Sequence, residues 1–537
     1  MSDLKTWLPN NRDFWHSQGQ KIAPKNLWIS VPSLMCAFGI WMQWSVISVQ
    51  MLNVGYPFDL YSLFSLIAVA GFSGATLRIS SSVLVQLCGG RNTLFITTGL
   101  LLLPSLGIII ALQRIDTPLW IFQLLALLSG IGGGSFSSFI SNTHFFYPKK
   151  QQYFILNLTA GIGIYGIVFA QVLIPLLMSY GVFSMVSGEP SLLIQSGSNI
   201  LGSIQTNHPL WLQNTGYLWL VILLPLMVLL WFGLDNIHTA NVTPRLPSLS
   251  FAFLTIISIL TLGLLLSALG LWLTMPTSNK GEHFILLKEL VIIAIPLVAS
   301  VIFKTLAKHK RLNAALPHRL LFCPRTFMLS LLYIMFLGSF MGFAAAFPLT
   351  IKSLFGYSHA FENEALHAMA NPNAPSVLAY AWIAPLIGIL IHPFGSWIAE
   401  KTGGRGITRL SAVIMILCSL GIAYYAHHAF HSITPEEYFI PFYLLFLGLF
   451  AASGMGSGSV YHMLFTSIPP RQLRMTLIWM SALAAYGVFY IPMQIGEQIK
   501  AGTPERAMLI FSIFYSFCIV IHQLLNLRKR TEKVYPI

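Results

Sequence analysis

Fourteen long apolar stretches follow one another along the 537 residues, and they constrain the fold more than any other feature of the sequence. Each stretch is long enough to cross the hydrocarbon core of a bilayer as a helix. Charged residues make up only 9% of the chain, against about 25% in an average soluble domain. The pattern therefore predicts an all-α membrane protein. We place its transmembrane helices near residues 28–52, 61–85, 93–113, 118–145, 153–178, 216–234, 251–274, 285–303, 326–352, 376–399, 407–427, 438–467, 474–496 and 506–527.

The net charge of +14 would suit a nucleic-acid-binding protein, but its distribution favours a membrane protein. If the N-terminus lies inside, most of the 30 Lys and Arg residues fall in the inner segments, with the densest run in 304–325. Cytoplasmic loops carry such an excess of positive charge. We expect an integral, multi-pass protein of the plasma (inner) membrane with both termini cytoplasmic. Contact with membrane lipids is expected, and a nucleic-acid partner is not.

An internal repeat relates the two ends of the chain. Arg78 lies eleven residues before Gly89-Gly90-Arg91, and His392 lies eleven residues before Gly403-Gly404-Arg405. The glycine-rich run 129–135 resembles 453–459, and the pair Tyr165-Gly166 recurs as Tyr486-Gly487, all at similar offsets. The repeat predicts two six-helix halves with two inserted helices between them. The expected division is a cytoplasmic N-terminal segment 1–27, a first half 28–234, an inserted pair 251–303, a second half 326–527 and a cytoplasmic tail 528–537.

Two repeated halves that meet at the membrane midplane are typical of secondary transporters. Glycines in the repeated spans would allow the helices to approach closely and to slide as the halves rock. Static packing by small residues remains an alternative explanation for the same glycines. The candidate conformational glycines are Gly161, Gly163, Gly166, Gly454, Gly456 and Gly458. The inserted pair is rich in Leu and Ile, and we expect it to face lipid outside the transport path.

Arg78 is the only charged residue between Tyr61 and Val85. An arginine at the bilayer centre costs ~2.5–3.5 kcal/mol on insertion scales unless it faces a protein interior or a water-filled cavity. Such a residue predicts a binding site for an anion. The alternative is an arginine that only pairs with backbone carbonyls or with a buried acid.

The residues at these positions resemble the nitrate/nitrite porters of the major facilitator superfamily. The resemblance is carried by Gly71–Arg78 with Val85–Arg91, by 129–142 with His144–Lys150, by Ser330–Tyr333 with Gly338–Gly342, and by 453–459. It covers nearly all of the chain except the inserted pair. It implies the major facilitator fold and a site for a flat anion between the halves. In that site two arginines would hold the anion, aromatic side chains would sandwich it, and asparagines of the fifth span would add polar contacts.

The resemblance assigns the first arginine to Arg78, an aromatic wall to Phe136 and a polar aromatic residue to Tyr333. His392 stands in place of the second arginine. The family pattern Gly-Leu-Asn-Gly-Gly-Leu-Gly-Asn reads Asn157-Leu-Thr-Ala-Gly-Ile-Gly-Ile164 here, so that Thr159 and Ile164 replace asparagines. An aromatic residue expected four positions after Tyr333 is Leu337. These departures leave the substrate open.

His392 admits two interpretations. It could be a titratable partner of Arg78, because a histidine titrates near neutral pH, and anion and proton could then enter together. It could instead be a neutral histidine whose ring is bound by helix carbonyls. The loops that contain Arg91, and Glu400 with Arg405, resemble degenerate copies of the superfamily's cytoplasmic gating motif. The first copy lacks the acid, so its gate is expected to be weaker.

We predict from these features a secondary transporter of a small anion that works by alternating access, with nitrate or nitrite as the leading substrate and protons as a candidate coupling ion. Another substrate, such as a larger organic anion or a metabolite, is the alternative. A nucleophile elbow, a phosphate loop and metal-ligand spacing are absent from the sequence, so we expect neither an enzyme nor a cofactor or metal. We expect a monomer. Symport or antiport, the direction of transport and the role of the inserted pair stay open.

Overall fold

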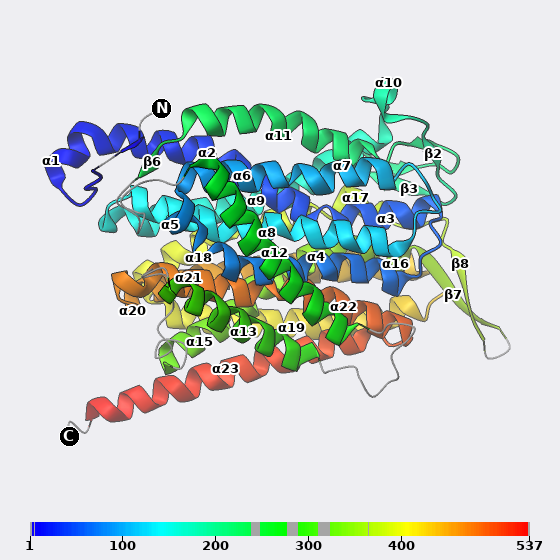
Figure 1. Ribbon diagram of the computed structural model, residues 1–537. Coiled ribbons are helices and arrows are strands. Elements are labelled where there is room, and N and C mark those ends of the chain that lie inside the picture. Colours follow the sequence, from blue (N-terminus) through cyan, green and yellow to red (C-terminus); the bar gives the residue numbers. More distant parts are fainter. Residues whose placement is uncertain are drawn as a thin grey trace.

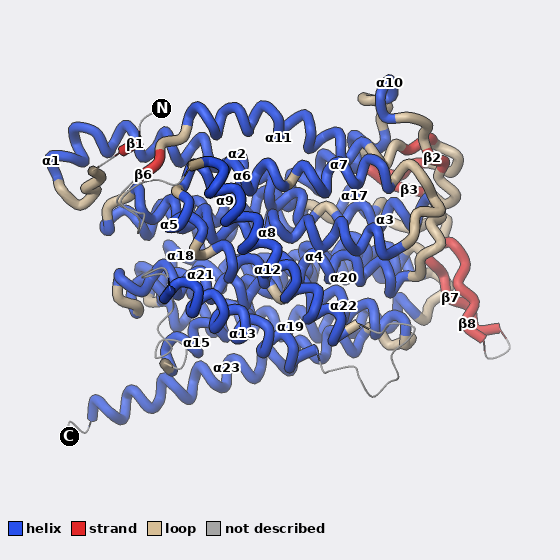
Figure 2. Tube along the Cα trace, viewed as in Figure 1, coloured by secondary structure: helices blue, strands red, loops and turns tan. Residues whose placement is uncertain are grey.

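The computed structural model describes residues 3–4, 6–237, 248–275, 288–309, 323–362 and 365–534. Long helices run side by side through the molecule (Figure 1), and the strands of the described residues are short and lie near the ends of these helices (Figure 2). Within the described residues, 14 helices are long and apolar enough to cross a membrane. The predicted all-α architecture with 14 spans is therefore confirmed.

The first half consists of six spans, two of which are divided into two helices. They are α2 (Gln20–Met42) with α3 (Trp44–Val54), α4 (Leu60–Ser81), α6 (Gly90–Leu100) with α7 (Leu102–Ala111), α8 (Leu119–Phe146), α9 (Lys149–Ser179) and α11 (Asn214–Gly233). Short helical segments accompany them at α1 (Arg12–Phe14), η1 (Trp15–Gly19), α5 (Leu84–Cys88) and α10 (Ser184–Ser187).

The inserted pair follows as α12 (Leu249–Thr274) and α13 (Lys288–His309). The second half repeats the six spans. They are α15 (Pro324–Tyr333) with the π-helical turn η4 (Ile334–Gly338) and α16 (Ser339–Phe355), α17 (Val377–Tyr380) with α18 (Ile383–Thr402), α19 (Gly404–Phe430), η5 (Pro435–Tyr438) with α20 (Phe439–Ser467), α21 (Pro470–Ala485) with α22 (Gly487–Lys500), and α23 (Glu505–Val534).

The repeat is visible in the backbone at the two glycine loops. Gly89 precedes α6 with φ +84°, and Gly403 precedes α19 with φ +83°. L-amino acids with a side chain rarely adopt this left-handed region, so glycine is required at the same point of both halves. The two loops thus make the same turn between consecutive spans.

The two halves meet along α4, α21 and α22 and along α3 with α16, while α9 contacts α18. The contact between α4 and α22 is close. A Cβ atom on Gly71 would come within 2.4 Å of the Val488 backbone, so only glycine fits there. Thr76 Oγ1 lies 2.8 Å from the Tyr486 hydroxyl, where α21 gives way to α22. These contacts bury the midplane of the boundary between the halves.

Figure 1 places both ends of the chain at one end of the bundle, which we call the terminal end. There β1 (Asp3–Leu4) pairs in parallel with β6 (Asn236–Ile237). Connections with four further strands in two antiparallel pairs lie at the opposite end: β2 (Ser191–Leu192) with β5 (Pro209–Leu210), and β3 (Gly197–Asn199) with β4 (Gly202–Ile204). A hairpin of β7 (Tyr357–Glu362) and β8 (Ala365–Ala370) lies at that end too.

The inserted pair packs more extensively on the two halves than its composition suggests. Helix α12 lies along α4, where a Cβ atom on Gly263 would come within 2.7 Å of Leu77. Phe303 of α13 lies in one apolar cluster with Ile79 of α4 and Trp479 of α21. The pair therefore covers one side of the boundary between the halves, because its small and apolar residues fit both. Its other faces carry exposed large apolar side chains, such as Leu265, as expected of a lipid-facing helix.

Candidate functional site

Arg78 lies between the two halves and is only 1% exposed. Its Nε donates a hydrogen bond to the Gly133 carbonyl of α8 at 3.1 Å, and its Nη1 donates to the Ser481 carbonyl of α21 at 2.8 Å. The first partner belongs to the first half and the second to the second half. The guanidinium thus joins the halves through backbone carbonyls, the kind of partner that the sequence leaves open as the alternative to an anion.

Three aromatic rings of the first half surround the guanidinium. Its Cζ atom lies 5.6 Å from the Phe38 ring centroid, 5.1 Å from that of Trp41 and 4.7 Å from that of Phe136. Trp41 is fixed because its Nε1 donates to the Ala70 carbonyl at 2.6 Å. Cation–π contacts in a desolvated site contribute about 2 kcal/mol. They help to explain how a charge without an ion pair among the described residues is tolerated in this position.

The guanidinium keeps donor capacity for a ligand. Of its five N–H groups, one is directed to each carbonyl, and Nη2 faces the Met341 sulfur at 3.9 Å. A thioether is a weak acceptor. An anion with oxygen atoms would be a stronger partner for this edge than the sulfur it faces now.

Tyr333 lies beside this group, at the end of α15 where the helix passes into the π-helical turn η4. Its side chain is 2% exposed and interacts electrostatically with Arg78. Such π-helical turns are frequent at functional sites. Phe136 therefore contacts the Arg78 guanidinium, and Tyr333 interacts with it electrostatically; their part in binding stays a prediction.

His392 lies in a second cluster and makes no recorded contact with Arg78. Its Nε2 lies 2.9 Å from Asn157 Oδ1 of α9, and its Nδ1 lies 2.7 Å from Ser457 Oγ of α20. Asn157 Nδ2 also donates to Ser396 Oγ at 3.4 Å, and the Tyr153 hydroxyl is hydrogen-bonded to the same oxygen. This chain of side chains links α9 of the first half to α18 of the second. The ring is also hydrogen-bonded to the Gly454 backbone of α20, so that side chains and a helix carbonyl together hold it.

A narrow cavity with room for about one water molecule lies beside His392. Its walls come from α9, η4, α16, α18 and α20 and include Gly161, Ile164, Leu337, Phe340, His392 and Ser457. Two of the departures from the family pattern, Ile164 and Leu337, therefore line this space. Most of its wall is apolar.

Five of the six candidate glycines lie where a side chain would meet a neighbouring helix. A Cβ atom would come within 2.6 Å of Leu34 at Gly163, 2.1 Å of the Met35 carbonyl at Gly166, 2.2 Å of the Gly388 carbonyl at Gly454, 2.1 Å of the Phe336 ring at Gly456 and 2.2 Å of the His392 carbonyl at Gly458. Gly161 differs, because nothing lies within 4 Å of its Cβ position. Close packing accounts for the five, and open space beside the cavity for Gly161.

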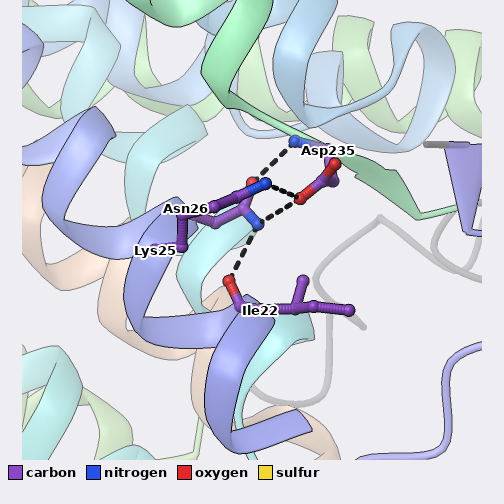
Figure 3. Close-up of polar contacts among 4 residues, drawn as sticks. All are labelled: Ile22, Lys25, Asn26 and Asp235. Atoms are coloured by element: carbon purple, nitrogen blue, oxygen red, sulfur yellow. Dashed lines mark hydrogen bonds and ion pairs between the residues drawn. The ribbon is translucent and has the colours of Figure 1, made fainter. Parts of the chain in front are cut away.

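The loop that contains Arg91, which we call the first gating loop, contacts the end of α11 and the residues that follow it. Asn236 Oδ1 accepts a hydrogen bond from the Arg91 backbone nitrogen at 2.9 Å, and the Arg91 guanidinium lies over the Trp231 ring at 5.0 Å. The neighbouring Asp235 forms an ion pair with Lys25 at 2.6 Å and accepts from Asn26 Nδ2 at 3.0 Å (Figure 3). Asp235 thus places an acid near the loop whose own sequence lacks one.

The second gating loop has a different environment. Glu400 and Arg405 are both exposed at the terminal end, and neither takes part in an ion pair recorded for the described residues. The expected closure by Glu400 and Arg405 stays a prediction for other conformations.

Several residues at the boundary were not singled out by sequence reasoning. Phe38, Trp41, Asn157 and Ser457 are common residue types in apolar spans, and only their packing reveals them. Arg474 carried a usable signal, since it is a charge close to the start of a predicted span. The structure buries it to 7% exposure between α21 and α8.

The described residues contain no group of three or more His, Cys, Asp or Glu side chains that could hold a metal ion.

Similar proteins were found by sequence and by structure. The chain is 28% identical to the nitrate/nitrite transporter NarU of Escherichia coli (strain K12), over 98% of this chain and 96% of that one. It is 28% identical to the probable nitrate/nitrite antiporter NarK2 of Thermus thermophilus, over 99% and 98% of the two chains. No protein-family model matches the chain.

Solved structures agree on the architecture. The xylose transporter XylE from E. coli in a partially occluded inward-open conformation matches with a TM-score of 0.53 and 13% identity, over 93% of this chain and 96% of that one. A POT family transporter in complex with a thioalcohol-conjugated peptide matches with a TM-score of 0.55 and 12% identity, over 93% and 96%. At such identities the likeness shows the fold alone. The chain therefore has the major facilitator fold of these solved structures, and its sequence resembles that of the nitrate/nitrite transporters of this superfamily.

Proposed function

We propose that this protein is a secondary active transporter of a small monovalent anion, with nitrate or nitrite as the best-supported substrate. The observation that carries the proposal is the environment of Arg78. A permanently charged guanidinium is buried between the halves, three aromatic rings surround it, and its recorded partners are backbone carbonyls and a thioether. These partners are all neutral, and an anion would supply the negative charge that they lack. The names of the relatives support nitrate or nitrite among small anions.

Alternating access follows from the partners of Arg78. Its bond to Ser481 crosses the boundary between the halves, whereas its bond to Gly133 and its aromatic contacts stay within the first half. When the halves rock apart, the guanidinium keeps its aromatic surroundings and loses the Ser481 carbonyl. A flat anion can then take over the freed N–H groups and stack against the rings. Closure around the bound anion would return the site to the buried state.

The orientation and the coupling ion are also part of the proposal. Positively charged residues gather at the terminal end in the sequence, which supports a cytoplasmic location for both termini. His392 could carry a proton, because both of its ring nitrogens face atoms that can accept a hydrogen bond. A protonated His392 would add a second positive charge to the path of the anion. We therefore favour proton-coupled uptake.

One observation favours a second candidate, a small organic anion. The cavity beside His392 is bounded by Ile164, Leu337 and Phe340, and it has open space at Gly161. An apolar wall in this place would accommodate a substrate with a hydrocarbon part better than nitrate.

A ligand screen followed by a flux measurement tests the proposal. Binding to the native state raises the apparent thermal stability as the ligand exceeds its Kd. Nitrate, nitrite, formate, acetate and butyrate should therefore be titrated against the purified full-length protein, and the strongest ligand should be followed into proteoliposomes. We expect nitrate or nitrite to stabilise the protein and to be transported. Stabilisation by butyrate alone would favour the organic anion, and no response to any anion would contradict both candidates.

A further inference from the structure

Arg474 is a second buried arginine at the boundary between the halves. It lies near the start of α21, its side chain is 7% exposed, and none of the ion pairs among the described residues involves it. Its Nη1 donates to Ser141 Oγ of α8 at 3.2 Å, and its Cζ atom lies 5.1 Å from the Phe145 ring centroid. A single neutral hydroxyl and an aromatic ring leave most of its five N–H groups for another ligand.

A second polar group in the same place is also unpartnered. His144 follows Ser141 by one helical turn in α8 and interacts electrostatically with Arg474. Its Nδ1 atom is buried and has no hydrogen-bond partner within the described part of the chain. Buried polar atoms are nearly always hydrogen-bonded, so an orphaned ring nitrogen calls for an explanation. An imidazole N–H beside an unsaturated guanidinium is suited to an anion.

The position of Arg474 along α21 connects it to the central site. Arg78 is bound to the carbonyl of Ser481, and Arg474 precedes Ser481 by two turns of the same helix. Two helical turns correspond to about 10 Å along the axis. Because α21 begins at the terminal end, Arg474 lies between the central site and that end of the bundle.

The contact with Ser141 is made across the boundary, from the second half to the first. If the halves separate at the terminal end, Ser141 moves away with α8 and the guanidinium loses its only recorded side-chain hydrogen bond. The N–H groups that this separation exposes can form charge-assisted hydrogen bonds with an incoming anion.

We propose that Arg474, with His144, forms a second anion-binding site through which the substrate passes between Arg78 and the terminal end. The site takes the same class of ligand as the central one, a small monovalent anion, and this inference rests on the proposed function. It differs from the central site in function, because it binds the anion only while the terminal end is open. Arg78 determines equilibrium affinity, and Arg474 determines the rate at which the anion enters or leaves.

The test compares binding and exchange in the full-length protein with nitrate as the probe. Equilibrium Kd is measured by thermal shift, and nitrate exchange is measured in proteoliposomes. Arg474→Gln should leave the Kd within about twofold of wild type and lower the exchange rate about tenfold, the size expected for one charged hydrogen bond. Arg474→Lys should recover most of the rate, because it restores the positive charge.

Two further variants separate a binding site from a mere closing contact. Ser141→Ala removes the contact across the boundary but keeps the positive charge of Arg474, so its exchange rate should stay above that of Arg474→Gln. An equally low exchange rate in Ser141→Ala would overturn the inference. Lys21→Gln removes an exposed positive charge at the same end. It is the control for a general effect of net charge on the exchange rate.

The outcomes also separate this inference from the proposed function. If wild type neither binds nor exchanges nitrate or any other small anion, the proposed function fails and the second site falls with it. If wild type binds and exchanges nitrate and Arg474→Gln does so at an equal rate, only the second site is wrong. An equal rise in the nitrate Kd of Arg474→Gln and Arg78→Gln would indicate one site that contains both arginines. That result would also contradict the inference.

Discussion

His392 Nε2 lies 2.9 Å from Asn157 Oδ1, and the two residues belong to different halves of the molecule. The resemblance places an arginine at position 392 and a glycine at position 157 in the family pattern, so both members of this pair depart from it. A larger side chain at 392 would meet Asn157, whereas a glycine at 157 would leave room for it. We therefore expect the two departures to compensate for one another.

The compensation predicts a coupled effect of mutations. We expect His392→Arg alone to lower the melting temperature and to gain little affinity for nitrate, because Asn157 occupies the space that the guanidinium needs. The double variant His392→Arg/Asn157→Gly should recover stability and bind nitrate more tightly than either single variant. Residues in direct contact typically show coupling of about 0.5–3 kcal/mol. Additive effects in a cycle of thermal unfolding measurements would mean that the two residues are not a compensating pair.

Transport should depend on pH through His392. Asn157 Oδ1 can accept a hydrogen bond from Nε2, and Ser457 Oγ can accept one from Nδ1, so the doubly protonated ring has an acceptor at each nitrogen. Protonation adds a positive charge, so the affinity for a monovalent anion should rise as the pH falls through the titration of His392. The measurement is the nitrate Kd from about pH 4 to pH 8, a range that also covers a buried histidine, which titrates below a free one.

The control for this pH dependence is His392→Ala. That variant should bind weakly at every pH, with a flat profile. An unchanged slope in His392→Ala would assign the titrating group to another residue and leave His392 as a structural histidine.

Gly161 and Gly163 lie two positions apart in α9 and offer a matched comparison. Gly161→Ala should leave the melting temperature nearly unchanged, because nothing lies within 4 Å of its Cβ position. Gly163→Ala should destabilise the protein, because its Cβ atom would come within 2.6 Å of Leu34, and overpacking typically costs about 1–3 kcal/mol. Gly161→Leu should also weaken binding of a bulky organic anion, because Gly161 lines the cavity beside His392. Equal melting temperatures for the two alanine variants would contradict this description of α9.

The inserted pair should be needed for stability more than for binding. Helix α13 is tied to α22 by the ion pair of Lys288 with Glu497 and by a hydrogen bond from the Tyr490 hydroxyl to Glu289 Oε1 at 2.9 Å. None of the described residues of the pair makes a recorded contact with the Arg78 guanidinium. Replacing 251–303 with a short linker should therefore lower the melting temperature and leave the nitrate Kd of the folded fraction close to wild type. A folded deletion protein that no longer binds would show that the pair contributes to the site.

The fold could be predicted because its determinants are periodic and local. Long apolar stretches specify spans, and the repeated glycine turns at Gly89 and Gly403 specify two copies of one unit. The extent to which α12 and α13 cover both halves could not be predicted, since a helix with many leucines can face lipid or protein equally well. The pairing of β7 with β8 was not predicted from the sequence either.

The candidate site could be predicted only in its charged member. Arg78 stands out because a lone charge in an apolar span is costly, and Phe136 and Tyr333 followed from the resemblance. The partners of His392 depend on which faces of α9, α18 and α20 meet, and one sequence does not specify those faces. Arg474 was overlooked because a charge at the start of a span is usually an interfacial residue, and only burial between the halves distinguishes it.

The central claim is that Arg78 binds the anion, and the most direct measurement is the nitrate Kd of Arg78→Lys beside that of wild type. Lysine keeps the charge but lacks the planar, forked set of donors that binds the Gly133 and Ser481 carbonyls and would bind an oxyanion. We predict that nitrate binding is weakened at least about tenfold in Arg78→Lys, as expected for loss of one charged hydrogen bond, and is lost in Arg78→Ala. A wild-type Kd in folded Arg78→Ala would contradict the account.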